Sequence, residues 1–243
     1  LAMMTFGATD CVPRHRRDPL TRSPAEPILN APPVAVLVAA SMPALYLVQA
    51  GLADRGLSLA FRPSSLWDGQ WWPGILTSMF VHGGWAHVAM NAVAALAFGP
   101  PVARQMGGAR GIVAFLLFYT VCGLVATLGY GLVHPASGDS LVGASGAVFG
   151  LMGAAIRMLD RTGPRLRSLG DRRFLSTAAA VMVANLFVGL VGLAPGMDGG
   201  RVAWEAHAAG FICGVLLIEP WLRVLERGHP TFASPPDLRD PDA

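Results

Sequence analysis

The sequence has no lysine, few charged residues of either sign and three cysteines. Charged residues make up 14% of the chain, whereas a soluble domain usually carries about 25%. Cys11, Cys122 and Cys213 are far apart and show neither a CxxC pair nor a zinc-ligand spacing with histidine. No patch of basic residues contains interleaved aromatic residues. These absences argue against a soluble globular domain, a zinc site and nucleic-acid binding.

Apolar residues dominate instead, at 53% of the chain, and they gather in six segments. A membrane-spanning helix needs about 20 such residues. Five segments have roughly that length, whereas the fourth is shorter and rich in glycine and alanine. The 29 glycines and 19 prolines are compatible with membrane helices, where neighbouring helices satisfy the freed backbone groups. The six segments are 34–52, 76–98, 111–132, 144–159, 174–195 and 203–222.

The segments predict an all-α, multi-pass integral membrane protein, a bundle of six transmembrane helices over residues 34–222 within the lipid bilayer. Residues 1–33 are expected to form a disordered basic tail and residues 223–243 a polar tail. Arginines concentrate in the first tail and in the loops after segments two and four, whereas residues 133–143 contain none. Because arginine-rich loops stay in the cytoplasm, we expect both termini there. All 18 residues of the lysine and arginine class are arginine, which indicates a GC-rich bacterial genome. We therefore expect the protein in the inner (plasma) membrane of a bacterium.

A short glycine-rich motif, Gly-Ala-Ser-Gly at 143–146, lies where the arginine-free loop meets the fourth segment. A serine at this helix N-terminus, Ser145, would lie beside unpaired backbone N–H groups and the positive end of the helix dipole. Such groups can stabilise an oxyanion. The same stretch also favours close helix packing, because Gly146, Gly150 and Gly153 form a face of small residues. Both interpretations can hold together.

A serine nucleophile needs a base, and His207 in the sixth segment is the candidate. A histidine inside a membrane span is costly and indicates function. Gly210 and Gly214 follow it and offer a second flat surface, suited to the one that carries Ser145. Both residues are expected near the arginine-poor ends of their segments. The alternative for His207 is a structural hydrogen bond between helices.

The second segment begins with three more polar residues, His82, His87 and Asn91. His87 and Asn91 are four apart and share a helix face, from which they can donate to a developing oxyanion. His82 is expected to be structural, bonded to the outer loop. The spacing does not match the HExxH zinc motif, so no metal site is predicted.

Two further polar residues lie close to the proposed base or in the fifth segment. Asn185 is expected to form an interhelical hydrogen bond rather than to act in catalysis. Glu205 is two residues from His207 and therefore on another face of the helix. We accordingly place Glu205 outside the predicted Ser–His pair.

Together these motifs resemble those of the rhomboid intramembrane serine proteases. The resemblance rests on His-xxxx-His-xxx-Asn, Gly-x-Ser-Gly and Ala-His-xx-Gly-xxx-Gly in the second, fourth and sixth segments, and covers about residues 34–222. It implies the six-helix bacterial-type fold and cleavage of single-pass transmembrane substrates without a cofactor. It also implies that Ser145 is the nucleophile and His207 the general base, that His87, Asn91 and the Ser145 backbone amide form the oxyanion hole, and that Phe149 stacks on His207. The supporting residues would be Gly143, Gly146, Gly210, Gly214 and His82.

Two positions depart from the family pattern. The outer loop has Trp71-Trp72-Pro73 without the arginine that often follows tryptophan there, and Phe98-Gly99 is followed by Pro100 rather than by a nearby glutamate. Both positions are structural in the family, so the resemblance implies that these departures affect stability more than catalysis. An alternative function is that of a non-catalytic rhomboid-like protein that binds membrane clients, although such relatives usually lack the serine or histidine. A transporter would show internal repeats and midplane charges, and neither is visible.

Overall fold

The computed structural model describes residues 31–69, 72–158, 166–192 and 202–227. In this part of the chain the regular structure is helical, apart from one isolated β-bridge between Phe61 and Leu141. The predicted tails lie outside the described residues, except for residues 31–33 and 223–227. The six longer helices are α1 (Pro33–Ala50), α4 (Trp85–Met106), α5 (Gly108–Val133), α6 (Ser145–Arg157), α7 (Arg172–Val191) and α8 (Trp204–Arg227). The short ones are α2 (Ser64–Trp67), α3 (Gly74–Thr77) and the 3₁₀ turns Leu57–Leu59 and Ser78–Phe80.

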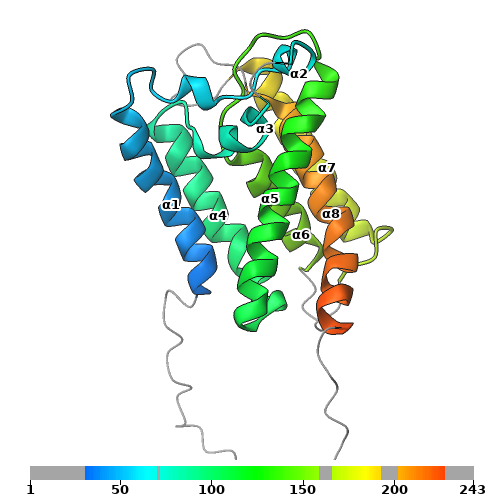
Figure 1. Ribbon diagram of the computed structural model, residues 1–243. Helices are drawn as coiled ribbons and strands as arrows, with labels where there is room; N and C mark the ends of the chain where they lie inside the picture. Colours follow the sequence, from blue (N-terminus) through cyan, green and yellow to red (C-terminus); the bar gives the residue numbers. More distant parts are fainter. Residues whose placement is uncertain (1–30, 70–71, 159–165, 193–201, 228–243) are drawn as a thin grey trace, which may run out of the picture. The chain divides into compact units, whose positions relative to one another are not determined.

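The long helices run side by side, and successive ones point in opposite directions (Figure 1). Helix α6 lies among its neighbours and contacts α4, α5, α7 and α8, most extensively α8. Helix α1 packs on α4, while α7 contacts mainly α8 and α6. Many large apolar side chains on the outer faces are exposed, particularly on α7, as expected where helices face lipid. The prediction of an all-α membrane bundle is confirmed.

The number of membrane spans stays a prediction. Within the described residues, five helices are long and apolar enough to cross a membrane, and the predicted fourth span is the shorter apolar helix α6, which has 13 residues. Ten of those residues are buried inside the protein. A helix enclosed by other helices does not itself have to match the thickness of the hydrocarbon layer, because protein rather than lipid surrounds its ends.

The predicted boundaries of two segments were wrong. Helix α4 begins at Trp85 rather than near 76, because the preceding backbone is held away from it: Gln49 of α1 bonds both the N–H and the C=O of His82, at 2.9 and 2.7 Å. It then runs through Pro100 to Met106 rather than ending at 98. Helix α8 likewise continues to Arg227, five residues beyond the predicted end at 222.

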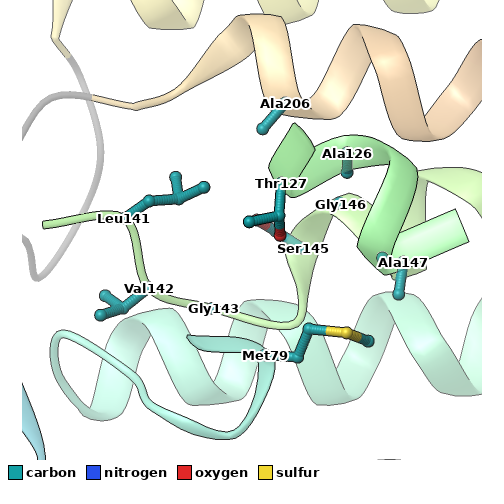
Figure 2. A pocket seen from close by; sticks show the side chains of 11 residues that line it. Met79, Ala126, Thr127, Leu141, Val142, Gly143, Ser145, Gly146, Ala147 and Ala206 are labelled. Carbon is teal, nitrogen blue, oxygen red and sulfur yellow. The ribbon is translucent and has the colours of Figure 1, made fainter. Parts of the chain in front are cut away.

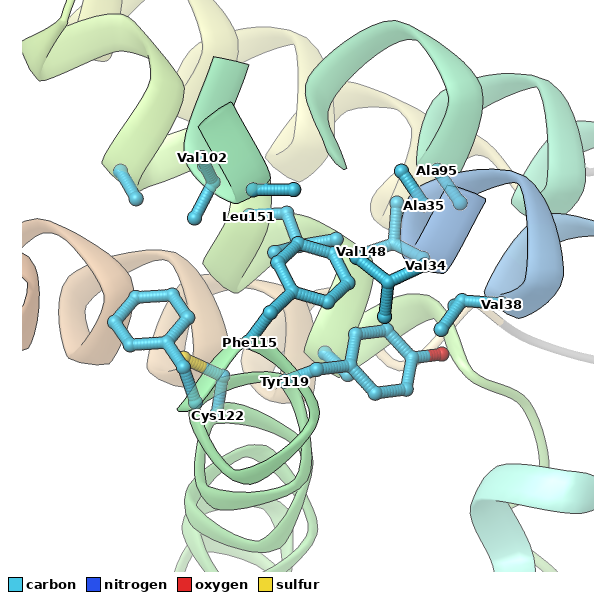
Figure 3. Close-up of a cluster of buried hydrophobic side chains, with 14 of the residues drawn as sticks. Val34, Ala35, Val38, Ala95, Val102, Phe115, Tyr119, Cys122, Val148 and Leu151 are labelled. Atoms are coloured by element: carbon cyan, nitrogen blue, oxygen red, sulfur yellow. The ribbon is translucent and has the colours of Figure 1, made fainter. Parts of the chain in front are cut away.

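A cluster of buried apolar side chains joins α1, α4, α5, α6 and, through Ile218, α8. Figure 3 shows Phe115 of α5 close to Leu151 of α6, and Tyr119 of α5 close to Val34 of α1. In a membrane such contacts stabilise mainly through close packing, because lipid is as apolar as the side chains themselves. This cluster packs α6 against its neighbours, including α8.

The loop between α1 and α4 fixes the chain segment that leads into α6. Phe61 and Leu141 exchange backbone hydrogen bonds of 3.0 and 2.8 Å, and the N–H of Gly143 donates to the carbonyl of Ser78 at 2.9 Å. Ser64 adds a bond from its N–H to the carbonyl of Ser137. The approach to Ser145 is therefore tied to a loop distant in sequence.

Candidate active site

Ser145 and His207 meet where α6 and α8 begin. Ser145 is the first residue of α6, and His207 lies in the first turn of α8. The Ser145 Oγ and the His207 Nε2 are 2.8 Å apart, within hydrogen-bonding distance. The N-cap residue of α6, Ala144, makes no side-chain cap hydrogen bond, so its own cap does not occupy the first-turn N–H groups beside Ser145.

Glycines allow the two helices to come this close. A Cβ atom on Gly210 would collide with the carbonyl of Gly146, and one on Gly214 with the carbonyl of Gly150. The backbones of α6 and α8 are thus in direct contact at two successive turns. The two interpretations of these glycines, close helix packing and a role in the Ser145 site, are compatible. The close contact of the helices brings the neighbouring Ser145 and His207 within hydrogen-bonding distance.

The His207 ring is held on two further sides. The ring of Phe149 stacks on it, with centroids 4.2 Å apart and an angle of 9° between the planes. The Nδ1 of His207 is 2.8 Å from the Oδ1 of Asn185 on α7, and the Nδ2 of Asn185 donates to the carbonyl of Trp204 at 2.9 Å. Asn185 therefore forms interhelical hydrogen bonds, as its position in an apolar segment suggested. Sequence reasoning missed that its partner is His207, because sequence does not give the register between two helices.

His87 turns one ring edge toward the loop that precedes Ser145. The N–H of Gly83 donates to the His87 Nδ1 at 3.3 Å. A neutral ring therefore carries its proton on Nε2. A Cβ atom at Gly143 would lie 2.8 Å from that Nε2. The φ angle of Gly143 is +119°, a region that favours glycine, so both the backbone conformation and the His87 ring require glycine here.

Asn91 and His82 flank His87. The amide of Asn91 donates to the backbone carbonyl of His87 at 2.9 Å, which leaves a second N–H on the same nitrogen. His82 precedes α4 instead of lying on it, and its ring is edge-on to that of His87 with centroids 5.3 Å apart. Its backbone bonds to Gln49, at the end of α1.

Glu205 points away from the Ser145–His207 pair. Its Oε1 lies 3.0 Å from the Nε2 of His134, at the end of α5, and it joins α8 to α5. Within the described ranges, no three His, Cys, Asp or Glu side chains gather in a way that could hold a metal ion.

A small pocket lies beside Ser145. Figure 2 shows the Ser145 side chain close to Thr127, with Met79 on one side and Ala206 on the other. Most of the remaining lining residues are alanine or glycine.

A model of the Rhomboid domain matches residues 68–223, which is more than half of the chain. The chain belongs to the rhomboid family. This rhomboid is an integral membrane protein with several apolar helices, in agreement with the resemblance seen in its motifs.

Three relatives of this rhomboid have similar sequences. Rhomboid protease GluP of Bacillus subtilis is 32% identical over 148 residues, 60% of this chain and 25% of the relative. RHOMBOID-like protein 9, chloroplastic, of Arabidopsis thaliana is 38% identical over 86 residues, 35% of this chain and 18% of the relative. Rhomboid-type serine protease 2 of Emericella nidulans is 30% identical over 147 residues, 60% of this chain and 26% of the relative. The chain thus spans less than half the length of these relatives, which come from a bacterium, a plant and a fungus.

Proposed function

We propose that this rhomboid is an intramembrane serine endopeptidase that uses Ser145 and His207. The observation that supports the proposal most directly is the 2.8 Å between the Ser145 Oγ and the His207 Nε2. A serine and a histidine at this distance, next to a helix N-terminus, have the geometry that acyl transfer requires. The relatives named rhomboid protease and rhomboid-type serine protease support the same reaction class.

In the proposed reaction, His207 takes the proton of the Ser145 hydroxyl while Oγ attacks the carbonyl carbon of the scissile peptide bond. The imidazolium then gives this proton to the leaving amine, the peptide C–N bond breaks and an acyl-enzyme remains. A water molecule, deprotonated by His207, attacks the ester and releases the acid product and free Ser145.

The tetrahedral intermediate carries a negative oxygen that needs hydrogen-bond donors. The candidates are the Nε2–H of His87, the second N–H of the Asn91 amide and the backbone N–H of Ser145. The positive end of the α6 dipole would add to their effect. Each donor is held before the reaction begins, as Gly83 bonds the other nitrogen of His87 and Asn91 is fixed to the His87 carbonyl.

The proposed substrates are single-pass membrane proteins, cut within or next to their transmembrane helix. The pocket beside Ser145 has little free space, which favours a small substrate residue. The site lies toward the ends of α6 and α8 that adjoin the arginine-free loop 133–143. We place this end at the outer face of a bacterial inner membrane and both chain termini in the cytoplasm.

The proposal is tested with purified protein in detergent, using a fluorophosphonate probe and a model transmembrane substrate. The wild type should be labelled and should cleave, whereas Ser145→Ala should do neither and should keep the wild-type melting temperature within a few degrees. Ser140→Ala, a matched change at an exposed serine of the loop before α6, should behave like the wild type.

Two results would argue against a Ser145 protease. Cleavage by Ser145→Ala at the wild-type rate would remove Ser145 from the mechanism. A wild type that binds the substrate but neither cleaves it nor reacts with the probe would favour the alternative function of a non-catalytic client-binding protein.

A further inference from the structure

Asn185 occupies a position next to His207 that the proposed mechanism does not yet use. It is 6% exposed and lies on α7, a helix that is otherwise apolar around it. Both polar atoms of its amide have partners: Oδ1 faces the Nδ1 of His207 at 2.8 Å, and Nδ2 donates to the backbone carbonyl of Trp204 at 2.9 Å.

The partner of Nδ2 determines where the protons lie in this group. A backbone carbonyl can only accept, so the amide nitrogen must face Trp204 and the amide oxygen must face His207. The amide oxygen in turn can only accept, so the neutral ring of His207 carries its proton on Nδ1. Its Nε2 is then left with a free lone pair, directed at the Ser145 hydroxyl 2.8 Å away.

This is the tautomer that a general base needs. In Ser–His and Cys–His hydrolases a third group commonly orients the imidazole from its other nitrogen. A carboxylate would do so at the cost of an ionised group inside a membrane bundle. An amide accepts the same hydrogen bond without a net charge.

We propose that Asn185 is a positioning residue for the proposed hydrolysis, which fixes the tautomer and orientation of His207 so that Nε2 can take the Ser145 proton. The inference rests on the proposed function of Ser145 and His207. The carbonyl of Trp204 and the stacked ring of Phe149 complete the setting in which Asn185 acts.

The simplest rival is that Asn185 only fastens α7 to α8. The two roles predict different results when its hydrogen bonds are removed. Loss of a fastener lowers thermal stability and leaves the chemistry of the folded enzyme intact. Loss of a positioning residue lowers kcat and changes how strongly the imidazolium form of His207 is stabilised.

The experiment compares Asn185→Leu with Asn185→Asp in purified full-length enzyme. The Leu variant has similar size and no acceptor. The Asp variant keeps an acceptor for the Nδ1–H in either protonation state. Gly189→Ala is the packing control on the same helix, because a Cβ there would press against the Trp204 side chain. Asn185→Ala replaces the Leu variant if that one does not fold.

For Asn185→Leu we expect kcat to fall by about 10–100-fold, since a misplaced base forfeits part of the general-base contribution. KM should change little, because substrate binding does not use Asn185. The acidic limb of the kcat/KM profile should move to lower pH, because the imidazolium loses its acceptor. Two other titratable groups lie near His207: His87, across the site, and Glu205, which is paired with His134. The substitutions at Asn185 leave both of these groups in place.

Asn185→Asp should restore most of kcat, whereas Gly189→Ala should lower the melting temperature and leave the acidic limb where it is in the wild type. Asn185→Leu with wild-type kcat and an unmoved limb would overturn the inference, as would Asn185→Asp losing as much activity as Asn185→Leu. Either result would leave the proposed function standing, since wild type and Ser145→Ala are assayed beside them. Absence of Ser145-dependent cleavage in the wild type would instead refute the proposed function and this inference with it.

Discussion

The ring nitrogen that carries the proton determines what each of the two histidines near Ser145 can do. Nδ1 of His207 donates to Asn185 and its Nε2 faces the serine, whereas in His87 the order is reversed: Nδ1 accepts from Gly83 and Nε2 carries the proton. Two histidines of one site are thereby prepared for different tasks. One can accept a proton, and the other can donate a hydrogen bond.

The sequence allowed the residues of the candidate site to be predicted, but not all of their contacts. Ser145 and His207 stand in short motifs whose glycines also explain why their helices approach. The contact of Asn185 with His207 depends on how α7 is rotated and shifted against α8. No local sequence pattern determines this rotation and shift. The sequence therefore predicted a hydrogen bond between helices for Asn185, but not that His207 is its partner.

The assignment of His87 and Asn91 as oxyanion donors gives a prediction about rates. His87→Ala or Asn91→Ala should lower kcat by about 10²–10³-fold, the usual cost of one lost donor. KM should change less, because these bonds strengthen mainly in the transition state. Steady-state kinetics on a transmembrane substrate will measure both constants.

The control is a melting curve for each variant in the same detergent. His87 and Asn91 are both buried, so their loss could act through the fold of α4. A large fall in melting temperature, combined with wild-type kcat at low temperature, would remove the two residues from the oxyanion hole. Activity should fall without vanishing, since the Ser145 amide remains.

At the scale of helices, the contact between α6 and α8 determines the geometry of the site. The two backbones touch at Gly146–Gly210 and again one turn further on at Gly150–Gly214. The motif glycines made this contact predictable from sequence. The start of α4 was not predictable in the same way, because it depends on Gln49, 33 residues before His82, holding the backbone that precedes the helix.

Gly214→Val should separate α8 from α6, because its side chain would meet the Gly150 backbone. Overpacking of this kind usually costs about 1–3 kcal/mol, and we expect a lower melting temperature. The Ser145–His207 distance should increase as well, so fluorophosphonate labelling of Ser145 should slow even well below the melting temperature.

The matched control for this change is Gly170→Val, in the loop before α7. Apart from its chain neighbours, no atom of the described residues lies within 4 Å of a Cβ placed there, so stability and labelling should stay near the wild-type values. If Gly214→Val labels as fast as the wild type, close contact of the two helices is not what positions Ser145 against His207.

At the scale of the whole molecule, charges distinguish the two ends of the bundle. Arg157, the last residue of α6, is buried and donates to the backbone carbonyls of Arg167 and Val215 and to the carboxylate of Glu219. A buried arginine is tolerated when its N–H groups have acceptors and its charge has a partner. At the Ser145 end, the loop 133–143 has no arginine.

The class of fold was predictable because it depends on properties that each segment carries alone. Long apolar runs with few charges indicate membrane helices wherever they pack. The number of crossings is a different matter, because α6 has 13 residues and its environment is set by the helices around it. Whether α6 brings the chain from one side of the membrane to the other therefore needs its own experiment.

Two introduced cysteines can test this crossing and the orientation together. Ser140 and Ser168 are both exposed, and in the described residues between them the one helix is α6. The background is Cys11→Ser, Cys122→Ala and Cys213→Ala, checked for unchanged cleavage. In intact spheroplasts, a membrane-impermeant maleimide should label Ser140→Cys at once and Ser168→Cys after permeabilisation, because arginine-rich loops remain in the cytoplasm. Labelling of both from one side would mean that α6 does not carry the chain across. The reverse pattern would keep the crossing but invert the protein, and would place the Ser145 site toward the cytoplasm.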